Sequence, residues 1–405
     1  MNANRRGFIG GVSAAVLTTG STRAFAQKKY DDGVTDSEIK IGHCCPYSGP
    51  ASAFGVIGKG IAAYWKMVND QGGINGRAVK FISLDDGYDP SKTVEAVRQL
   101  VEKEKVFSTF NILGTLTNTA VHKYLNTKKV PQLYVATGAS KWGDPQHFPW
   151  TMGFQLDFNT EGQIYAKHIL ANIKDARIAI LMQNDDFGKD YVAGFKKGLG
   201  SETSRIVETA SYELTDPTVD AQIIHLKSTG ANVFFNVSTP KFSALATRKA
   251  GEIGWKPTQY MTNISVSVSA VQKPAGFDNS QGIITAVYWK DSTDKRWDGD
   301  AELKVWRDWM TQYMPGANQA DANYIYAYGV SALMHETLRR CGDTLTRDNL
   351  MKQATSFQEF RVPCLLPGIT VSTSPTDYLP VQAVQLAKFK GETWELFGDV
   401  ISTGA

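Results

Sequence analysis

Two pairs of neighbouring acidic residues stand directly after predicted strands, and paired carboxyl groups are the side chains that general acid–base catalysis uses. The pairs are Asp85-Asp86 and Asp185-Asp186. Asp is also favoured at helix N-caps and in turns, where it accepts hydrogen bonds from backbone N–H groups. We therefore interpret both pairs as capping and turn residues, and we predict no catalytic residue.

The six histidines are scattered and do not form a metal-binding pattern. The chain has no HExxH sequence and no histidine–cysteine spacing typical of a metal site. It also has no Walker A loop, no GxGxxG that opens a helix after a strand, and no GxSxG elbow. We predict no metal and no cofactor, and the pattern favours a binding protein over an enzyme.

Polar loops between strands and helices are the other candidate sites, and they recur in both halves of the chain. One loop leads to Phe54-Gly55 and its counterpart leads to Phe187-Gly188, while the Gly-Thr-Leu-Thr loop at 114–117 resembles Val-Ser-Thr-Pro at 237–240. A helix after such a loop directs the N–H groups of its first turn at whatever occupies the loop. In open α/β sheets, ligands bind at this end of the strands. Two facing sheets would bring these loops and both phenyl rings to one cleft.

The elements that must position these loops alternate between strand and helix, which indicates parallel sheets covered by helices on both faces. An irregular, aromatic-rich segment at 150–159 separates two runs of this alternation, so we predict two domains of the same class. After an opening strand at Ile39, the predicted strands are 77–84, 106–113, 132–136, 177–182, 205–212, 231–237, 259–262 and 282–288. Helices are predicted around Ile57 to Val68, after Pro90, from Thr119, and at 164–173, 192–199, 301–313, 321–341 and 346–356.

The end of the chain, 381–389 and 393–397, is predicted to form a β-hairpin. If the strand at 282–288 returns to the first sheet and the hairpin pairs with the second, the chain crosses between the lobes three times. Several short crossings form a hinge that can close over a ligand. We place the first lobe at residues 37–157 plus 285–375 and the second at 158–284 plus 376–405.

Residues 1–26 have the parts of an export signal in the correct order, and we exclude them from the fold. Arg5-Arg6 has the twin-arginine form, a mildly apolar stretch follows at 8–19, and Ala24-Phe25-Ala26 is a small-x-small cleavage site. We expect cleavage near Ala26 and a mature periplasmic chain of 405 − 26 = 379 residues. No later segment approaches the roughly 18 consecutive apolar residues of a membrane span.

Length and composition agree with an exported two-domain protein. A mature chain of this length is too long for one compact core. The net charge is only +3 and no basic block is interleaved with aromatic residues, so we expect no nucleic-acid partner. We also expect a monomer. The cysteines are Cys44, Cys45, Cys341 and Cys364. The sequence allows either a disulfide between Cys341 and Cys364 or four buried free thiols.

Several motifs occur in an order that resembles the periplasmic leucine/isoleucine/valine-binding family of ABC importers. They begin with Ile39-Lys40-Ile41-Gly42 and Ser48-Gly49-Pro50-Ala51, and the strongest is the glycine-rich run at 69–76 followed by the acidic loop at 85–90. The match continues through 177–180 and Phe187-Gly188 into the C-terminal third, and it covers nearly the whole mature chain. The resemblance implies an α/β protein with two doubly wound parallel-sheet lobes, the type I periplasmic binding fold, joined by a three-strand hinge.

The resemblance also implies a site. In this family main-chain N–H groups and hydroxyls hold the ligand carboxylate, and free N–H groups and hydroxyl donors suit a carboxylate. The corresponding residues here are Gly114, Thr115, Leu116 and Thr117 on one loop and Ala136, Thr137 and Gly138 on the next. The family's aromatic walls fall on Phe54 and Phe187, and its second-lobe tyrosine falls on Thr239. The implied partners are a small-molecule ligand and an inner-membrane ABC permease.

The sequence departs from the family at the ammonium end of the ligand. Amino-acid binders have an acidic residue after the strand at 259–262, whereas this chain has Asn263-Ile264-Ser265 there. A buried ammonium without a carboxylate is costly, so we expect a hydrophobic or aromatic acid that need not carry an α-amino group. Asp185 or Asp186 is an alternative partner for an ammonium. A ligand sensor of the same fold and an exported hydrolase are the alternative functions.

Overall fold

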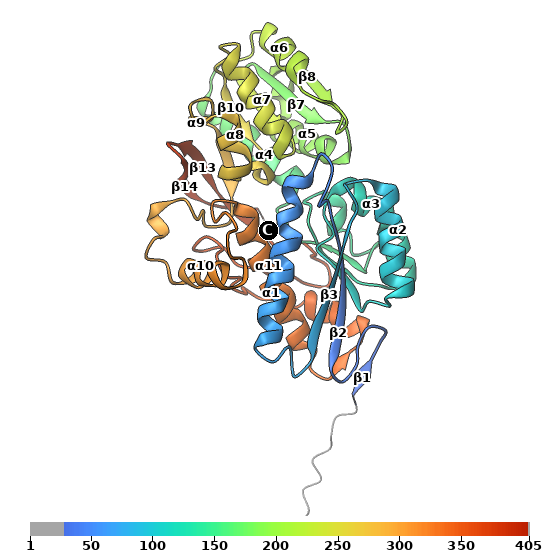
Figure 1. Cartoon of the computed structure of the whole chain (residues 1–405). Helices are drawn as coiled ribbons and strands as arrows, with labels where there is room; N and C mark the ends of the chain where they lie inside the picture. Colours follow the sequence, from blue (N-terminus) through green and yellow to red (C-terminus); the bar gives the residue numbers. More distant parts are fainter. Residues whose placement is uncertain (1–27, 404–405) are drawn as a thin grey trace, which may run out of the picture.

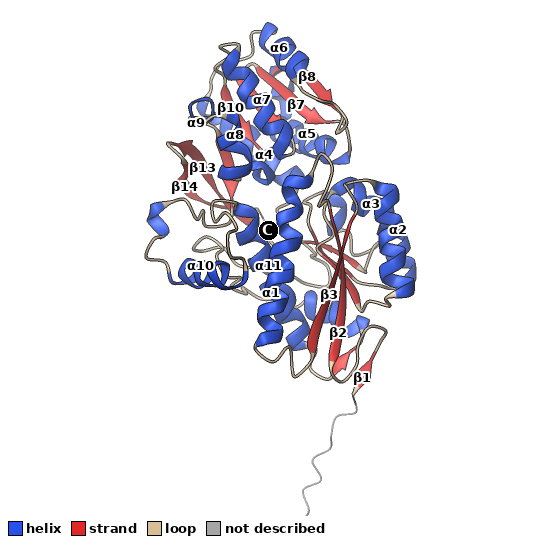
Figure 2. Ribbon diagram, in the orientation of Figure 1, coloured by secondary structure: helices blue, strands red, loops and turns tan. Residues whose placement is uncertain are grey.

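A computed structural model describes residues 28–403, and the predicted export signal at 1–26 lies outside the described residues. Two α/β lobes stand one above the other in Figure 1, with helices on both faces of each sheet (Figure 2). The first sheet has five parallel strands in the order β3-β2-β4-β5-β6. Its strands are β2 (Glu38–Cys45), β3 (Ala78–Asp85), β4 (Ser108–Phe110), β5 (Gln132–Val135) and β6 (Thr151–Gly153).

Three helices connect the strands of the first sheet, as the predicted alternation requires. They are α1 (Gly55–Asp70), α2 (Pro90–Arg98) and α3 (Thr115–Lys128). Helix α1 buries Ile57, Ile61 and Val68, the face that its apolar spacing predicts. Helix α2 begins as the sequence predicts. Pro90 lies in its first turn, and the Asp89 carboxylate accepts from the N–H groups of Ser91 and Lys92 in the same turn.

The second sheet has seven strands in the order β14-β13-β11-β10-β9-β7-β8. Its parallel strands are β7 (Ile178–Gln183), β8 (Ile206–Tyr212), β9 (Val233–Val237), β10 (Thr258–Met261) and β11 (Ile284–Val287). The antiparallel hairpin β13 (Ala383–Lys390) and β14 (Thr393–Ser402) continues it, which confirms the predicted hairpin and its place in the second sheet. The helices of this lobe are α4 (Phe158–Asn172), α5 (Asp186–Leu199), α6 (Asp220–Ser228), α7 (Pro240–Glu252), α8 (Lys273–Ala275) and α9 (Phe277–Ser280).

The strand at 282–288 does not return to the first sheet, so that expectation is wrong. Strand β11 pairs in parallel with β10 and antiparallel with β13, and its Ala286 N–H donates to the Tyr165 hydroxyl of α4. A short strand buried on both faces carries no pattern that selects one sheet over the other. The predicted boundary between residues 284 and 285 therefore falls inside β11; the division into lobes otherwise stays a prediction.

The C-terminal helices pack on the first lobe. They are α10 (Ala301–Tyr313), α11 (Ala322–Arg340) and α12 (Arg347–Ala354), and α11 lies alongside α1 in the middle of Figure 1. Near the base of this lobe, the short strands β1 (Lys29–Tyr30) and β12 (Thr344–Leu345) pair in parallel. Because β13 lies in the second sheet, the chain passes between the lobes three times, before α4, after β11 and before β13.

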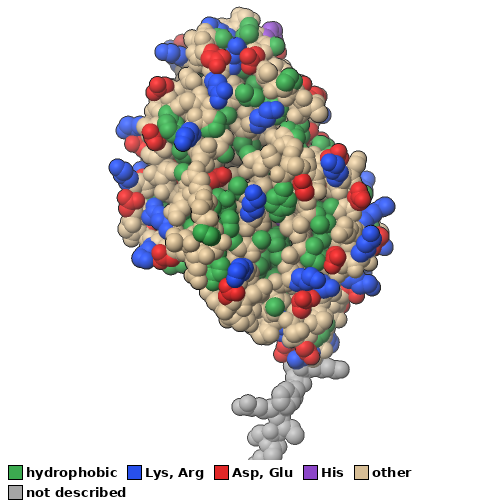
Figure 3. Space-filling view, in the orientation of Figure 1, with side chains coloured by type: hydrophobic (Ala, Val, Ile, Leu, Met, Phe, Trp, Pro, Cys, Tyr) green, Lys and Arg blue, Asp and Glu red, His purple; other side chains and the backbone are tan. Residues whose placement is uncertain are grey.

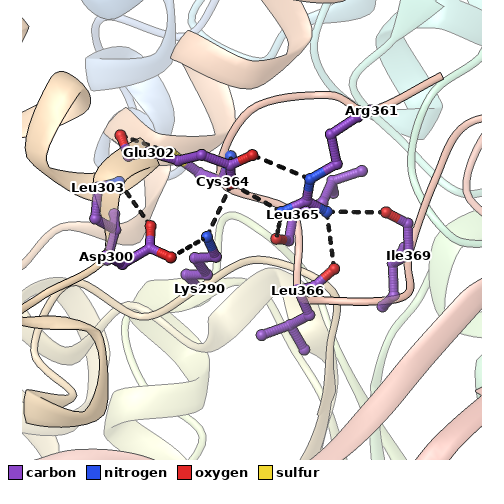
Figure 4. A network of polar contacts seen from close by, with 9 residues as sticks. All are labelled: Lys290, Asp300, Glu302, Leu303, Arg361, Cys364, Leu365, Leu366 and Ile369. Atoms are coloured by element: carbon purple, nitrogen blue, oxygen red, sulfur yellow. Dashed lines mark hydrogen bonds and ion pairs between the residues drawn. The ribbon is translucent and has the colours of Figure 1, made fainter.

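A cluster of ion pairs joins two of these passages (Figure 4). The Lys290 ammonium lies 2.6 Å from Asp300 and 2.8 Å from Glu302, and Arg361 donates to the same Glu302 carboxylate. The Arg361 guanidinium also donates to the backbone carbonyls of the 365–369 loop. Lys290 is only 3% exposed, so its buried ammonium needs these carboxylates as partners. The cluster thereby fixes the second passage against the loop that leads to the third.

Two local features differ from the predicted elements. Helix α3 begins at Thr115, four residues before the predicted start. The hydroxyls of Thr117 and Thr119 donate to the Gly114 and Thr115 carbonyls, so these polar side chains are accommodated inside the helix instead of forming a loop. Strand β6 and the start of α4 lie inside the segment that the sequence suggests is irregular.

All four cysteines are buried and unbonded to one another, so Cys341 and Cys364 form no disulfide here. Burial raises the pKa of the Cys341 and Cys364 thiols to about 12, which leaves both as neutral core residues. Within residues 28–403 no helix is long and apolar enough to cross a membrane.

Candidate functional site

A cavity lies between the two lobes and receives residues from the first and second passages of the chain, together with Leu366, Trp394 and Leu396. The empty space between its walls is about 1120 Å³, part of it open to solvent, which is enough for a ligand of amino-acid size. In Figure 3, hydrophobic side chains gather along the middle of the molecule, while charged side chains are spread around its outline. Eight of the eleven residues that the sequence analysis names for the site line the cavity: Phe54, Gly114, Thr115, Ala136, Thr137, Phe187, Thr239 and Asn263.

The first-lobe end of the cavity is built around the N-terminus of α3. Gly114 occupies the N-cap with φ of 97° and supplies no capping side chain. A Cβ at this position would lie 2.3 Å from the Tyr88 ring, so only glycine lets the loop approach that ring. The hydroxyls of Thr115 and Thr137 lie 2.6 Å apart at the cavity wall. One of these hydroxyls donates to the other, which leaves one hydroxyl proton for a ligand beside an uncapped helix N-terminus, an arrangement that suits an anion.

The second-lobe helix α5 has its N-terminus capped by its own chain. The Asp185 carboxylate accepts hydrogen bonds from the N–H groups of Phe187 and Gly188. Burial raises the pKa of Asp185, and these hydrogen bonds oppose that shift. The interpretation of the acidic pairs as caps and turns is confirmed for Asp185, and for Asp85 and Asp86, whose carboxylates accept from neighbouring backbone N–H groups.

Thr239 lies at the cavity within a hydrogen-bonded group of the second lobe. Its backbone N–H donates to the Tyr212 hydroxyl, and its own hydroxyl lies 3.3 Å from the same atom. Tyr212 in turn donates to Gln183, whose amide donates to Asp185. The polar groups of this wall are thus occupied by one another.

Asn263 begins a 3₁₀ turn (Asn263–Ser265) after β10 and contacts a carboxyl group that the sequence does not reveal at this position. Its backbone N–H and its side-chain Nδ2 both donate to Glu161, at 2.8 and 2.6 Å. Glu161 is fully buried and also accepts from the hydroxyls of Tyr165 and Tyr191. Burial raises the pKa of Glu161 to about 7, although these four hydrogen bonds favour its ionised form.

The two predicted phenyl walls are both buried at the cavity, but their surroundings differ. Phe187 packs edge-on against Phe158 at 5.4 Å and Tyr191 at 5.5 Å. Phe54 ends a 3₁₀ turn (Ser52–Phe54) before α1 and is 7% exposed. The second wall is therefore part of an aromatic cluster, and the first is a single ring.

Leu116, Thr117 and Gly138 do not line the cavity, and the Thr117 hydroxyl donates to the Gly114 carbonyl inside α3. Leu116, on the first turn of α3, is 37% exposed and is not among the residues that line the cavity. A Cβ on Gly138 would lie 2.0 Å from the Leu156 carbonyl oxygen, so this glycine serves the close approach of two chain segments. Family position alone does not distinguish these residues from their neighbours that face the ligand space.

Two polar contacts join the lobes at the rim of the cavity, through residues that do not line it. The Lys141 ammonium of the first lobe lies 2.6 Å from the Asp186 carboxylate of α5. Nearby, the backbone N–H and hydroxyl of Ser140 donate to Asp190. Asp186, an alternative partner for a ligand ammonium, is therefore paired with lysine outside the cavity, and Asp185 is committed to capping.

The model of the family described as "Periplasmic binding protein" matches residues 38–393, which is most of the chain. The chain belongs to this family. The periplasmic binding protein is also 26% identical over 222 residues to the Leu/Ile/Val-binding protein homolog 3 of Brucella melitensis, an alignment that covers 53% of this chain and little more than half, 56%, of that relative.

Two solved structures share the fold of this periplasmic binding protein at low identity. A branched chain amino acid ABC transporter protein from Thermus thermophilus with bound valine has a TM-score of 0.82 and 14% identity, over 91% of this chain and 97% of the other. A solute binding protein of an ABC transporter from R. palustris in complex with 4-hydroxybenzoate has a TM-score of 0.75 and 20% identity, with the same two coverages, 91% and 97%. These matches confirm the predicted type I fold.

Sequence reasoning missed much of the wall of this periplasmic binding protein. Tyr88 follows β3, and the Tyr288-Trp289-Lys290 passage and Tyr326 of α11 come from elements far along the chain. Asp291 and Asp294 also line the cavity. The Asp291 carboxylate accepts from Thr293 and from Trp394 N–H, and Asp294 caps the 3₁₀ turn at Lys295–Trp297. Among the described residues, no group of three or more His, Cys, Asp or Glu side chains is arranged to hold a metal.

Proposed function

We propose that this periplasmic binding protein binds a small carboxylate-bearing ligand between its lobes and delivers it to an inner-membrane ABC importer. The ligand class is a branched-chain or other hydrophobic amino acid, or a related aromatic or aliphatic acid. The supporting observation is the uncapped N-terminus of α3, where the hydroxyls of Thr115 and Thr137 face the cavity. N–H and hydroxyl donors at a helix start bind a carboxylate by charge-assisted hydrogen bonds.

The apolar part of the ligand packs between Phe54 and Phe187. Both rings are buried at the cavity, and aromatic walls with a few convergent polar groups are typical of small-molecule sites. The valine and the 4-hydroxybenzoate of the two structural neighbours each combine a carboxylate with a small apolar body, which agrees with this class. The protein acts without turnover, as an exported monomer whose signal is removed near Ala26.

Calorimetry with matched acids and amides tests the carboxylate. Leucine is compared with leucinamide, and benzoate with benzamide, because each amide keeps the apolar body and lacks the anion. We expect micromolar or tighter binding of at least one acid and no detectable binding of its amide. Native mass spectrometry of the purified protein identifies any acid retained in the closed cavity. Equal affinity for an acid and its amide would contradict the proposal.

Delivery to an importer is tested separately in cells. A strain without this chain should lose high-affinity uptake of the bound acid, and a chain with Thr137→Val should restore uptake poorly. Unchanged uptake in the deletion strain would favour a sensor of the same fold.

A further inference from the structure

We infer that Glu161 is a positioning residue that fixes the amide of Asn263, so that the cavity offers an amide oxygen to a hydrogen-bond donor on the ligand. The inference rests on the proposed function and narrows its ligand class. The acid would carry a hydroxyl or an amino group in addition to its carboxylate. Asn263 lines the cavity and is 8% exposed, while Glu161 lies behind it, fully buried.

The hydrogen bonds around Glu161 determine which way the Asn263 amide points. An ionised carboxylate only accepts hydrogen bonds, so the Asn263 group that faces it must be the NH₂. Nδ2 donates to Glu161 Oε2 at 2.6 Å, and the backbone N–H of the same residue donates to Oε1 at 2.8 Å. Two contacts to one carboxylate hold both the backbone and the side chain of Asn263. The amide cannot rotate by half a turn without placing its oxygen against the carboxylate.

The other side of the Asn263 amide is therefore an acceptor. No group within residues 28–403 donates a hydrogen bond to Asn263 Oδ1, although the residue lies at the cavity wall. An acceptor at the wall of an apolar cavity favours a ligand that donates to it, and disfavours a ligand that leaves it unpaired. The donor can be a hydroxyl or an ammonium, since both donate to a neutral amide oxygen.

The structural alternative is that Glu161 and Asn263 only stabilise the turn after β10. Tyr165 and Tyr191 donate to the same carboxylate, and such a buried group can serve folding alone. The two roles differ in one measurable quantity, the ratio of affinities for ligands with and without a donor. A purely structural role would change all affinities together.

The test compares matched acids by calorimetry at about pH 8, because the Glu161 carboxyl is ionised at this pH even with its raised pKa. The pairs are 2-hydroxy-4-methylpentanoate with 4-methylpentanoate, and 4-hydroxybenzoate with benzoate; leucine is the third arm, in which the donor is an ammonium. For the wild-type protein we expect the donor-bearing member of at least one pair to bind about tenfold more tightly. The arm that shows the effect identifies hydroxyl or amine as the donor.

Glu161→Gln is the decisive variant. Its side-chain amide can donate to Asn263 Oδ1, so the Asn263 amide is free to turn its NH₂ into the cavity. We expect the affinity ratio to fall to about one, with the donor-free acid bound within about threefold of wild type. Tyr191→Phe is the matched control, because it removes one donor to the same carboxylate oxygen but leaves both contacts of Asn263. This control should keep the wild-type ratio.

Asn263→Leu keeps the test valid if Glu161→Gln does not fold. This variant removes the amide oxygen that accepts from the ligand, so it should also bring the affinity ratio to about one. A ratio near one in the wild-type protein, or an unchanged ratio in both variants, would overturn the inference while leaving carboxylate binding intact. Failure of every acid to bind would overturn the proposed function, and the inference with it.

Discussion

The first turns of α3 and α5 lie at the same cavity, but their N–H groups have different partners. Gly114 before α3 has no side chain to cap the helix, whereas Asp185 before α5 accepts from two N–H groups of the first turn. The first turn of α5 contains the aromatic-glycine pair Phe187-Gly188, whose first-lobe counterpart, Phe54-Gly55, stands at the start of α1 and not of α3. The difference supports the proposal that the first lobe holds the charged end of a ligand, because the first-turn N–H groups of α5 are already paired with Asp185.

Substitution of the phenyl walls gives the largest expected effect on stability. It tests whether the second wall stabilises the fold more than the first. Phe187→Ala should lower the free energy of unfolding by about 3–5 kcal/mol, because it leaves a cavity in the cluster with Phe158 and Tyr191. Phe54→Ala should cost less, because no aromatic ring packs on Phe54 among the described residues. Denaturant unfolding of both variants measures the difference. An equal loss would show that the two walls are energetically alike.

The internal carboxyl of the second lobe should give this protein a distinct pH dependence. Because the pKa of Glu161 is raised from 4.5 to about 7, the native state holds a proton that the unfolded chain releases. The stabilisation is complete below about pH 4.5 and is lost as the pH rises to about 7, by up to about 3 kcal/mol. Glu161→Gln should lack this part of the slope. Unfolding curves of the wild type and of this variant between those pH values measure the difference in the pH dependence of stability, and identical slopes would contradict the prediction.

Matched threonine substitutions compare the polar groups of the two walls directly. Thr137→Val should weaken binding of the carboxylate ligand about ten- to 100-fold, because it removes a donor to a charged group. Thr239→Val should weaken binding only a few-fold, since its hydroxyl lies among Tyr212 and Gln183. Calorimetry with the acid that binds wild type most tightly measures both. A larger loss at Thr239 would place the charged end in the second lobe instead.

The smallest effect concerns the rim contact between the lobes. Lys141 and Asp186 are 33% and 53% exposed, so their ion pair contributes less than about 1 kcal/mol to closure. Lys141→Met should therefore raise Kd by a few-fold or less, and added salt should reduce the difference between the variant and wild type. Salt-independent loss of more than tenfold would show that Lys141 contacts the ligand itself.

The sequence predicts the alternation of strands and helices well, because periods of two and 3.6 are local signals. It does not predict the partner of β11, since a strand buried on both faces fits either sheet. Eight of the eleven candidate residues reach the cavity because they follow strands, where the topology brings loops together. Glu161 is not predictable in this way, because it lies on α4, 102 residues before the asparagine that it contacts.

The hairpin that closes the second sheet has a consequence for how the protein behaves at high concentration. Strand β14 forms one of the two edges of that sheet, the other being β8, and an open edge is a template for pairing with another chain. The register shift between Val384 and Leu386, the positive φ of Gly398, and the charges of Glu395 and Asp399 all interrupt that edge. A strand so interrupted resists edge-to-edge association, which supports the proposal that the protein circulates through the periplasm as single molecules.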